Sequence, residues 1–197
     1  MANFEKAKEA ILHYLEEHLP DHLSYHSLDH TLDVYQVCMK LAEHCSLSEK
    51  DRELLGMAAL LHDIGFVRTY RGHEEASGAM ARELLPQFGY EPDQIQRIIE
   101  LIMVTRVPQS PSDLLGRLLC DADLDYLGRS DFFVTGNRLF DEFKSLGIVQ
   151  DEREWNHLQV QFLSVHHYHT DYSRTHREPL KQKHLEQVKE IVAGYVD

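Results

Sequence analysis

The sequence predicts an all-α protein. Apolar residues recur about every 3.6 residues along most of the chain, and no segment alternates apolar and polar residues over a length that suggests a strand. Prolines, glycines and capping residues separate these periodic segments at intervals typical of helices. The chain has 197 residues, of which 43% are hydrophobic, so it is long enough to bury one substantial core. We therefore expect a single helical domain over residues 1–197.

The breaks between periodic segments define the expected helices. Pro20 closes the first helix, Gly65 ends the third and Pro92 begins the fifth, while Pro108 and Pro111 interrupt the chain before the sixth. In chain order, the helices are expected over residues 4–19, 29–41, 48–65, 73–88, 92–105, 112–124, 131–146, 152–165 and 179–196.

Two serines are expected to cap these helices. Ser48 is followed three residues later by Asp51, a pattern that resembles a capping box, and Ser112 precedes the apolar run that leads to Asp123. Both positions place a hydroxyl oxygen where the first free backbone amides of a helix need an acceptor.

The charge balance argues against a nucleic-acid partner. The formal net charge is -13, and the 20 lysines and arginines are scattered rather than clustered, so a phosphate backbone would be repelled. The first residues form no targeting signal, and no run approaches the roughly 20 apolar residues that cross a bilayer. We expect a cytoplasmic protein that binds neither nucleic acid polymers nor membranes, with a homodimer as one possible assembly.

Cysteine usage agrees with that location. Cys38, Cys45 and Cys120 are odd in number and have no CxxC spacing. This pattern favours reduced thiols over a disulfide framework or a thiolate zinc site.

The stretch Leu60-Leu61-His62-Asp63-Ile64-Gly65 is hard to explain by packing. It places an imidazole and a carboxylate side by side at the apolar end of a helix, where an unpaired carboxylate would cost several kcal/mol. A divalent cation is the natural means of neutralising Asp63. His30 upstream, and Asp123 or Asp121 downstream, could complete its ligand set.

These candidates are too far apart in sequence to form a local chelate, so helix packing would have to bring them together. Two imidazoles and two carboxylates suit one ion of Mn, Fe, Zn, Co, Ni or Mg. Such a set leaves coordination positions open, which is typical of a catalytic rather than a structural metal site.

The ordered pattern resembles the HD-domain metal-dependent phosphohydrolase superfamily. The resemblance runs from about residue 25 to 128 and is carried by three segments: Tyr25-His26-Ser27-Leu28-Asp29-His30-Thr31, Leu60-Leu61-His62-Asp63-Ile64-Gly65, and Cys120-Asp121-Ala122-Asp123-Leu124-Asp125-Tyr126-Leu127-Gly128. It implies a helical bundle with a metal-site core at about residues 25–128, and C-terminal helices over 131–197 that close the pocket. It also implies hydrolysis of a small anionic phosphoester or nucleotide by a metal-activated water.

The resemblance also implies roles for single residues. His30, His62, Asp63 and Asp123 would bind the metal, and Asp63 would in addition orient the nucleophile. Relatives place the last ligand in an Ala-Asp step, which matches Asp123. On a helix Asp121 and Asp125 would share the opposite face, so one of them is expected either to contact a metal ligand from behind or to pair with an arginine.

His73 and Arg106 are the other expected catalytic residues, with Arg106 contacting an anionic group of the substrate. Some HD proteins hold two metals through further histidines, and His73 could be one of them. No histidine lies between His73 and Asp123, however, which favours one metal. His26, four residues before His30, could face the same cleft, and one or two histidines of His166-His167-Tyr168-His169 could close the pocket.

Two other functions fit the same ligands. One is a metal-binding or ligand-sensing module that has lost turnover, and the other is a di-iron oxygenase of the HD type, which the missing histidine disfavours.

Overall fold

The computed structural model describes residues 2–195, and every regular element within them is helical. The prediction of an all-α fold is therefore confirmed. The α-helices cover Phe4–His18 (α1), Leu28–His44 (α2), Glu49–Leu61 (α3), His73–Leu84 (α4), Pro92–Met103 (α5), Leu114–Asp123 (α6), Phe132–Ser145 (α7), Glu152–Val165 (α8), Asp171–His176 (α9) and Glu178–Ala193 (α10). Short 3₁₀ helices cover Ile64–Val67 (η1), Leu85–Phe88 (η2) and Asp125–Gly128 (η3).

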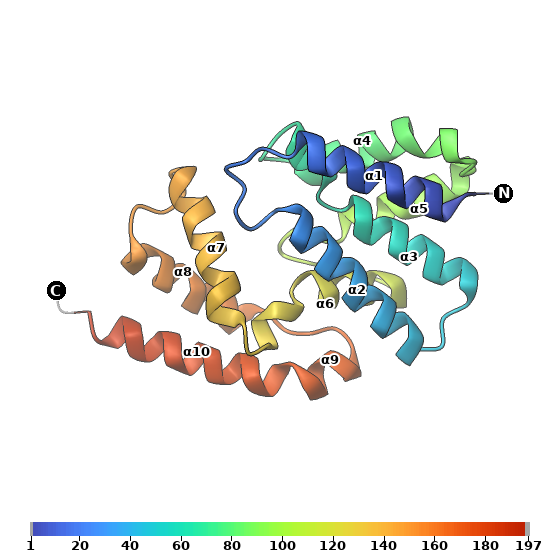
Figure 1. Ribbon diagram of the computed structural model, residues 1–197. Coiled ribbons are helices and arrows are strands. Elements are labelled where there is room, and N and C mark those ends of the chain that lie inside the picture. The colour runs from blue at the N-terminus through green and yellow to red at the C-terminus, as the bar shows by residue number, and fades with distance from the viewer. Residues whose placement is uncertain (1, 196–197) are drawn as a thin grey trace. The chain divides into compact units, whose positions relative to one another are not determined.

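The chain divides into two compact units (Figure 1). The first contains the residues up to Asp21 together with His26–Asp123, and the second contains His22–Tyr25 together with the chain from Leu124 onward. The expectation that the whole chain acts as one domain, with its C-terminal helices closing the pocket, stays a prediction.

Helix α3 is the centre of the first unit. It packs against α2, α5 and α1, and α6 packs against α2 (Figure 1). Every residue from Leu54 to Leu61 is buried, as expected of a helix that is apolar on all sides. Residues that directly follow Leu61 are thereby carried into the interior of the unit.

The end of α3 differs from the prediction. The helix ends at Leu61 instead of Gly65, and Asp63 leaves the α conformation with φ -110° and ψ 4° before η1 begins. Gly65 is required for a reason other than helix termination. A Cβ on it would lie 2.0 Å from the carbonyl oxygen of His73 and 2.7 Å from the backbone nitrogen of Ser77. The glycine therefore allows α4 to approach η1 closely.

Ser77 links these segments by hydrogen bonds. The backbone N–H of Gly65 donates to Ser77 Oγ over 2.8 Å, and the Ser77 hydroxyl donates to the carbonyl oxygen of His62, also over 2.8 Å. Ser77 is fully buried, so these bonds fix the backbone on both sides of Asp63 from one residue of α4.

Other boundaries also differ from the sequence prediction. The fourth helix tightens into η2 at Leu85, and the carboxylate of Asp113, instead of Ser112, accepts a hydrogen bond from Gly116 N at 3.0 Å to open α6. Helix α9 was not predicted. The last helix begins at Glu178 instead of Pro179, and its expected end at Val196 lies outside the described residues.

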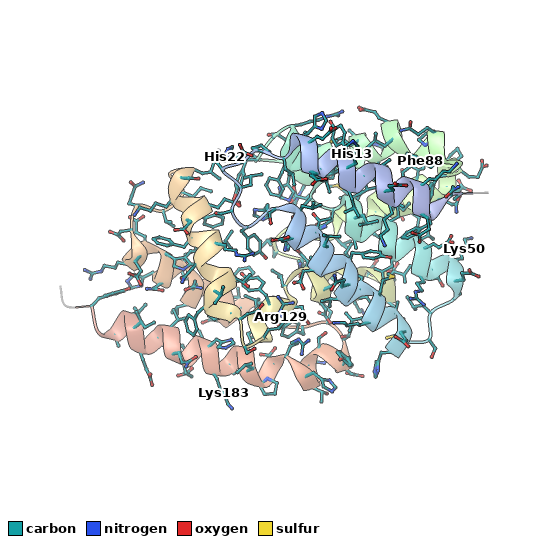
Figure 2. All side chains as sticks on the ribbon, in the orientation of Figure 1. His13, His22, Lys50, Phe88, Arg129 and Lys183 are labelled. Carbon is teal, nitrogen blue, oxygen red and sulfur yellow. The ribbon has the colours of Figure 1, made fainter. Side chains whose placement is uncertain are left out.

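The second unit has its own apolar core and buried ion pairs. Its core is formed by Tyr25, Leu124, Tyr126, Leu127, Phe132, Leu163, Leu185 and Val188. Buried Asp125 accepts a hydrogen bond from Arg177 Nε at 2.7 Å and lies 3.6 Å from Arg129. Of the two roles expected for Asp121 or Asp125, Asp125 therefore has the pairing with an arginine. On α10, Lys183 points away from the ribbon (Figure 2), whereas Lys181 is buried and pairs with Glu178 at 2.9 Å.

None of the helices within residues 2–195 combines the length and hydropathy needed to cross a bilayer.

The close contact at Gly65 predicts that a larger residue there destabilises the fold. Gly65→Ala is expected to lower the free energy of unfolding by at least about 2 kcal/mol, because the added Cβ meets backbone atoms that cannot move without shifting α4. Urea unfolding measures this loss. Gly78→Ala is the matched control, since a Cβ there would meet only the Ile99 side chain, at 3.1 Å; an equal loss in both variants would contradict the interpretation.

Candidate metal centre

The four expected metal ligands meet in the first unit. His30 lies in the first turn of α2, His62 and Asp63 follow α3, and Asp123 is the last residue of α6. The Nε2 atoms of His30 and His62 are 3.4 Å apart. Three helix ends thus bring together residues separated by as many as 93 positions in the chain (123 − 30 = 93).

The donor atoms have the spacing of a ligand shell. His30 Nε2 lies 3.4 Å from both Asp63 Oδ2 and Asp123 Oδ1, and His62 Nε2 lies 3.2 Å and 3.5 Å from the same two oxygens. Neighbouring ligands bound about 2.1 Å from a metal ion stand about 3.0–3.4 Å apart. The residues present therefore fit a divalent ion bound by two imidazole nitrogens and two carboxylate oxygens.

The site is almost closed to solvent. The side chain of His62 is 1% exposed, those of His30 and Asp63 are 8% and 9% exposed, and that of Asp123 is 16% exposed. Two carboxylates at this depth require compensating positive charge, because desolvating an ion costs several kcal/mol. A bound cation or protonated histidines can supply it.

The ring of His62 is held in an orientation suitable for metal binding. Its Nδ1–H donates to the carbonyl oxygen of Ala59 over 2.8 Å, which leaves the lone pair of Nε2 directed toward the other donors. The Ala59 carbonyl belongs to the last turn of α3, where carbonyls lack helical partners. The end of the helix therefore selects the tautomer of the ligand that follows it.

Proximity shifts the pKa values of all four groups. Burial alone would lower the pKa of both histidines, but the carboxylates of Asp63 and Asp123 outweigh it, raising the pKa of His30 and raising that of His62 well above 6.5. Burial alone would raise the pKa of the two aspartates, but the histidines hold the pKa of Asp63 well below 3.8 and lower that of Asp123 to about 2. Protons and a metal ion would therefore compete for the same nitrogen atoms.

Of the three neighbouring aspartates, Asp123 lies at the centre. Together with His30 and His62 it offers donor atoms that all lie within 4.8 Å of one another. Asp121 is fully buried on α6, and Asp125 pairs with arginines in the second unit. This arrangement agrees with the choice of Asp123 made from its Ala-Asp context.

His73 lies beside the centre. Its Nε2 is 3.4 Å from Asp63 Oδ1, the oxygen of Asp63 that does not face His30 and His62, and its Nδ1 is 3.3 Å from the carbonyl oxygen of Tyr70. The ring stacks on Phe66, with centroids 4.0 Å apart, and His26 packs on the same phenylalanine at 4.2 Å. His26 is 5.9 Å from His30 between ring centroids, so it borders the centre from the side of Phe66.

Arg106 forms ion pairs with acidic residues of α4. Its guanidinium pairs with Glu75 and lies 3.9 Å from buried Glu74, which in turn lies 3.7 Å from His73 Nε2. The sequence analysis missed Glu74, because nothing distinguishes it from Glu75 in the first turn of α4. The cluster His166-His167-Tyr168-His169 belongs to the second unit, and its expected part in the pocket stays a prediction.

Comparison with known proteins identifies the class of protein. A family model for the HD domain matches residues 27–125, and the chain belongs to this family. Divalent metal binding is a property of HD domains, and the close grouping of His30, His62 and Asp123 agrees with it.

Solved structures show the same fold. A predicted HD superfamily hydrolase from an uncultured Thermotogales bacterium is similar with a TM-score of 0.62 and 24% identity, over 94% of this chain and 91% of that one. YpgQ from Bacillus subtilis, crystallised in complex with ADP, is similar with a TM-score of 0.63 and 20% identity, over 97% of each chain. The chain therefore shares its fold with these two proteins.

The shifted pKa values predict how stability depends on pH once metal has been removed. Histidines with raised pKa values stabilise the fold fully below pH 6.5 and lose that contribution as the pH rises through their folded values. Aspartates with lowered pKa values stabilise it above pH 3.8 and lose that contribution as the pH falls toward 2. The melting temperature in chelator should therefore be highest between these limits and fall above pH 6.5.

Thermal unfolding across this pH range measures the effect. The loss above pH 6.5 should shrink in His30→Gln and persist in His13→Gln, since the His13 side chain is 67% exposed on α1. A melting temperature that rises steadily from pH 6.5 upward in chelator would contradict the prediction.

Proposed function

We propose that this protein is a metal-dependent phosphohydrolase that acts on a small phosphoester or nucleotide. The observation that carries the proposal is the buried grouping of His30 and His62 with Asp63 and Asp123, whose donor atoms stand 3.2–3.5 Å apart. Two nitrogens and two oxygens leave room in the shell of a divalent ion for water and substrate. The ADP bound to Bacillus subtilis YpgQ supports a nucleotide as one substrate class.

A divalent ion bound by these residues would polarise a phosphoryl oxygen and lower the pKa of a bound water toward neutrality. The side chains of the site have different roles around such an ion. His30, His62 and Asp123 would hold the ion, and Asp63 directs Oδ2 to His30 and His62 and Oδ1 to His73.

His73 is placed to handle a proton. Tyr70 accepts a hydrogen bond from its Nδ1, and its Nε2 faces Asp63 Oδ1 at the border of the centre. When both ring nitrogens carry a proton, Nε2–H can donate a hydrogen bond to Asp63 Oδ1 or transfer its proton to an oxygen of the substrate, which leaves a neutral imidazole. Since Phe66 stacks on the ring, His73 keeps this orientation.

We further propose that the substrate is a small anion and not a nucleic acid polymer, because the net charge of -13 disfavours long phosphate chains. The protein would work in the cytoplasm, away from membranes, and a homodimer is compatible with this function.

The proposal predicts about one equivalent of divalent metal per chain in protein purified without chelator. Asp63→Ala and His62→Ala should lose this metal, because each removes a donor from the shell, whereas His13→Ala on the exposed side of α1 should retain it. Elemental analysis gives the metal content. With Mn²⁺ added, the wild type should release phosphate or pyrophosphate from members of a nucleotide panel, and both metal-site variants should fall to background.

The same measurements distinguish the alternatives. Metal and tight nucleotide binding without turnover at high protein concentration would indicate a ligand-binding module. Two iron equivalents with oxygen consumption would indicate an oxygenase and make His73 a ligand. Absence of metal from the wild type after reconstitution would overturn the hydrolase proposal.

Arg106 provides a separate test of substrate charge. If its guanidinium binds an anionic group, Arg106→Ala should raise KM for a phosphorylated substrate about tenfold with a smaller change in kcat. Glu75→Gln should lower KM, because it removes the acid with which Arg106 is paired. Steady-state kinetics at fixed Mn²⁺ measure both variants, and unchanged KM values in both would remove Arg106 from the substrate site.

A further inference from the structure

Asp123 has a second contact that the proposed chemistry does not use. Its Oδ1 faces His30 and His62, while its Oδ2 accepts a hydrogen bond from Gln109 Nε2 over 3.3 Å. Gln109 lies in the segment between α5 and α6, between Pro108 and Pro111 and outside any helix.

The contact fixes how Asp123 presents its carboxylate. A free carboxylate can rotate and offer both oxygens to a cation, whereas a donor on Oδ2 holds the group with only Oδ1 directed at the histidines. The amide of Gln109 must place its NH₂ group on this side, because the reverse orientation would bring two acceptor oxygens together.

The other end of the same amide points to a ligand. Gln109 Oε1 is buried, and no group within residues 2–195 lies within hydrogen-bonding distance of it. Buried amide oxygens nearly always have a donor. The same amide contacts Asp123 Oδ2, the oxygen that does not face His30 and His62, so a water or hydroxyl that donates to Oε1 would lie next to Asp123.

The segment that carries Gln109 is anchored to the helix that carries Asp123. The thiol of Cys120, one turn before Asp123 on α6, donates to the carbonyl oxygen of Val104 over 3.2 Å. On the other side, Asp113 forms an ion pair with Arg97 of α5 and accepts the hydrogen bond that opens α6. These contacts fix the segment that carries Gln109 relative to α6, which carries Asp123.

We propose that Gln109 is a positioning residue of the metal centre: it holds Oδ2 of Asp123, so that Oδ1 would be the oxygen offered to a bound ion, and its buried Oε1 accepts a hydrogen bond from a water or hydroxyl next to Asp123. This inference rests on the proposed function, because it requires that the centre binds a divalent ion.

The test is Mn²⁺ binding by electron paramagnetic resonance, with the melting temperature in chelator as a second readout. Gln109→Leu replaces the amide by an apolar side chain and so removes the donor and the buried acceptor. It should weaken Mn²⁺ binding about tenfold and leave the melting temperature unchanged or higher, since a buried acceptor without a partner is removed. Gln87→Leu, at an exposed position of η2, is the matched control and should change neither.

A second variant tests the inference in case Gln109→Leu does not fold. Gln109→Asn keeps the amide but is one methylene shorter and cannot reach Asp123 Oδ2 from the same backbone position, so it should show the same loss of affinity. Wild-type affinity in both variants would overturn the inference alone, as would a loss of affinity that only follows a lowered melting temperature. Absence of Mn²⁺ binding in the wild type would overturn the proposed function and this inference with it.

Discussion

The first unit depends on how the charge of its buried metal-site residues is balanced. Each of two carboxylates stands within 3.5 Å of both imidazoles in the interior of the unit, beside a helix whose last eight residues are all buried. Removing these groups from water is unfavourable unless a cation or protons balance the two aspartates. Without a metal ion, the raised pKa values of the histidines favour their positive charge, and the lowered pKa values of the aspartates favour their negative charge.

Backbone contacts, more than side-chain packing, keep this group in register. The carbonyl oxygens of Ala59 and His62 accept hydrogen bonds from His62 Nδ1 and the Ser77 hydroxyl, and the amide of Gly65 donates to Ser77. One turn of α4 is thereby tied to both sides of the His62-Asp63 step. The close approach at Gly65 makes this possible, so a residue without a functional group determines how precisely two functional residues are placed.

The sequence was sufficient for the helical class and for His30, His62 and Asp63, because a charged pair after an apolar helix is anomalous without a partner. The choice of Asp123 over Asp121 depended on the resemblance to HD-domain proteins. The sequence was insufficient where the role of a residue depends on contacts between distant parts of the chain. Gly65 was interpreted as a helix end although α4 requires it, Asp113 opens α6 in place of Ser112, and α9 was missed. Glu74 and Gln109 resemble ordinary surface residues in the sequence, and only the folded chain brings them beside His73 and Asp123.

The hydrogen bond from Cys120 to Val104 also affects thiol chemistry. Burial, with the nearby charges of Asp123 and Asp121, raises the pKa of this thiol far above its usual range. A thiol kept protonated is a poor nucleophile, so alkylating agents and peroxide react slowly with it. Half-buried Cys45, at the end of α2, is the more accessible target. Oxidative damage would therefore begin away from the metal centre, and labelling of Cys120 would report local opening of α6.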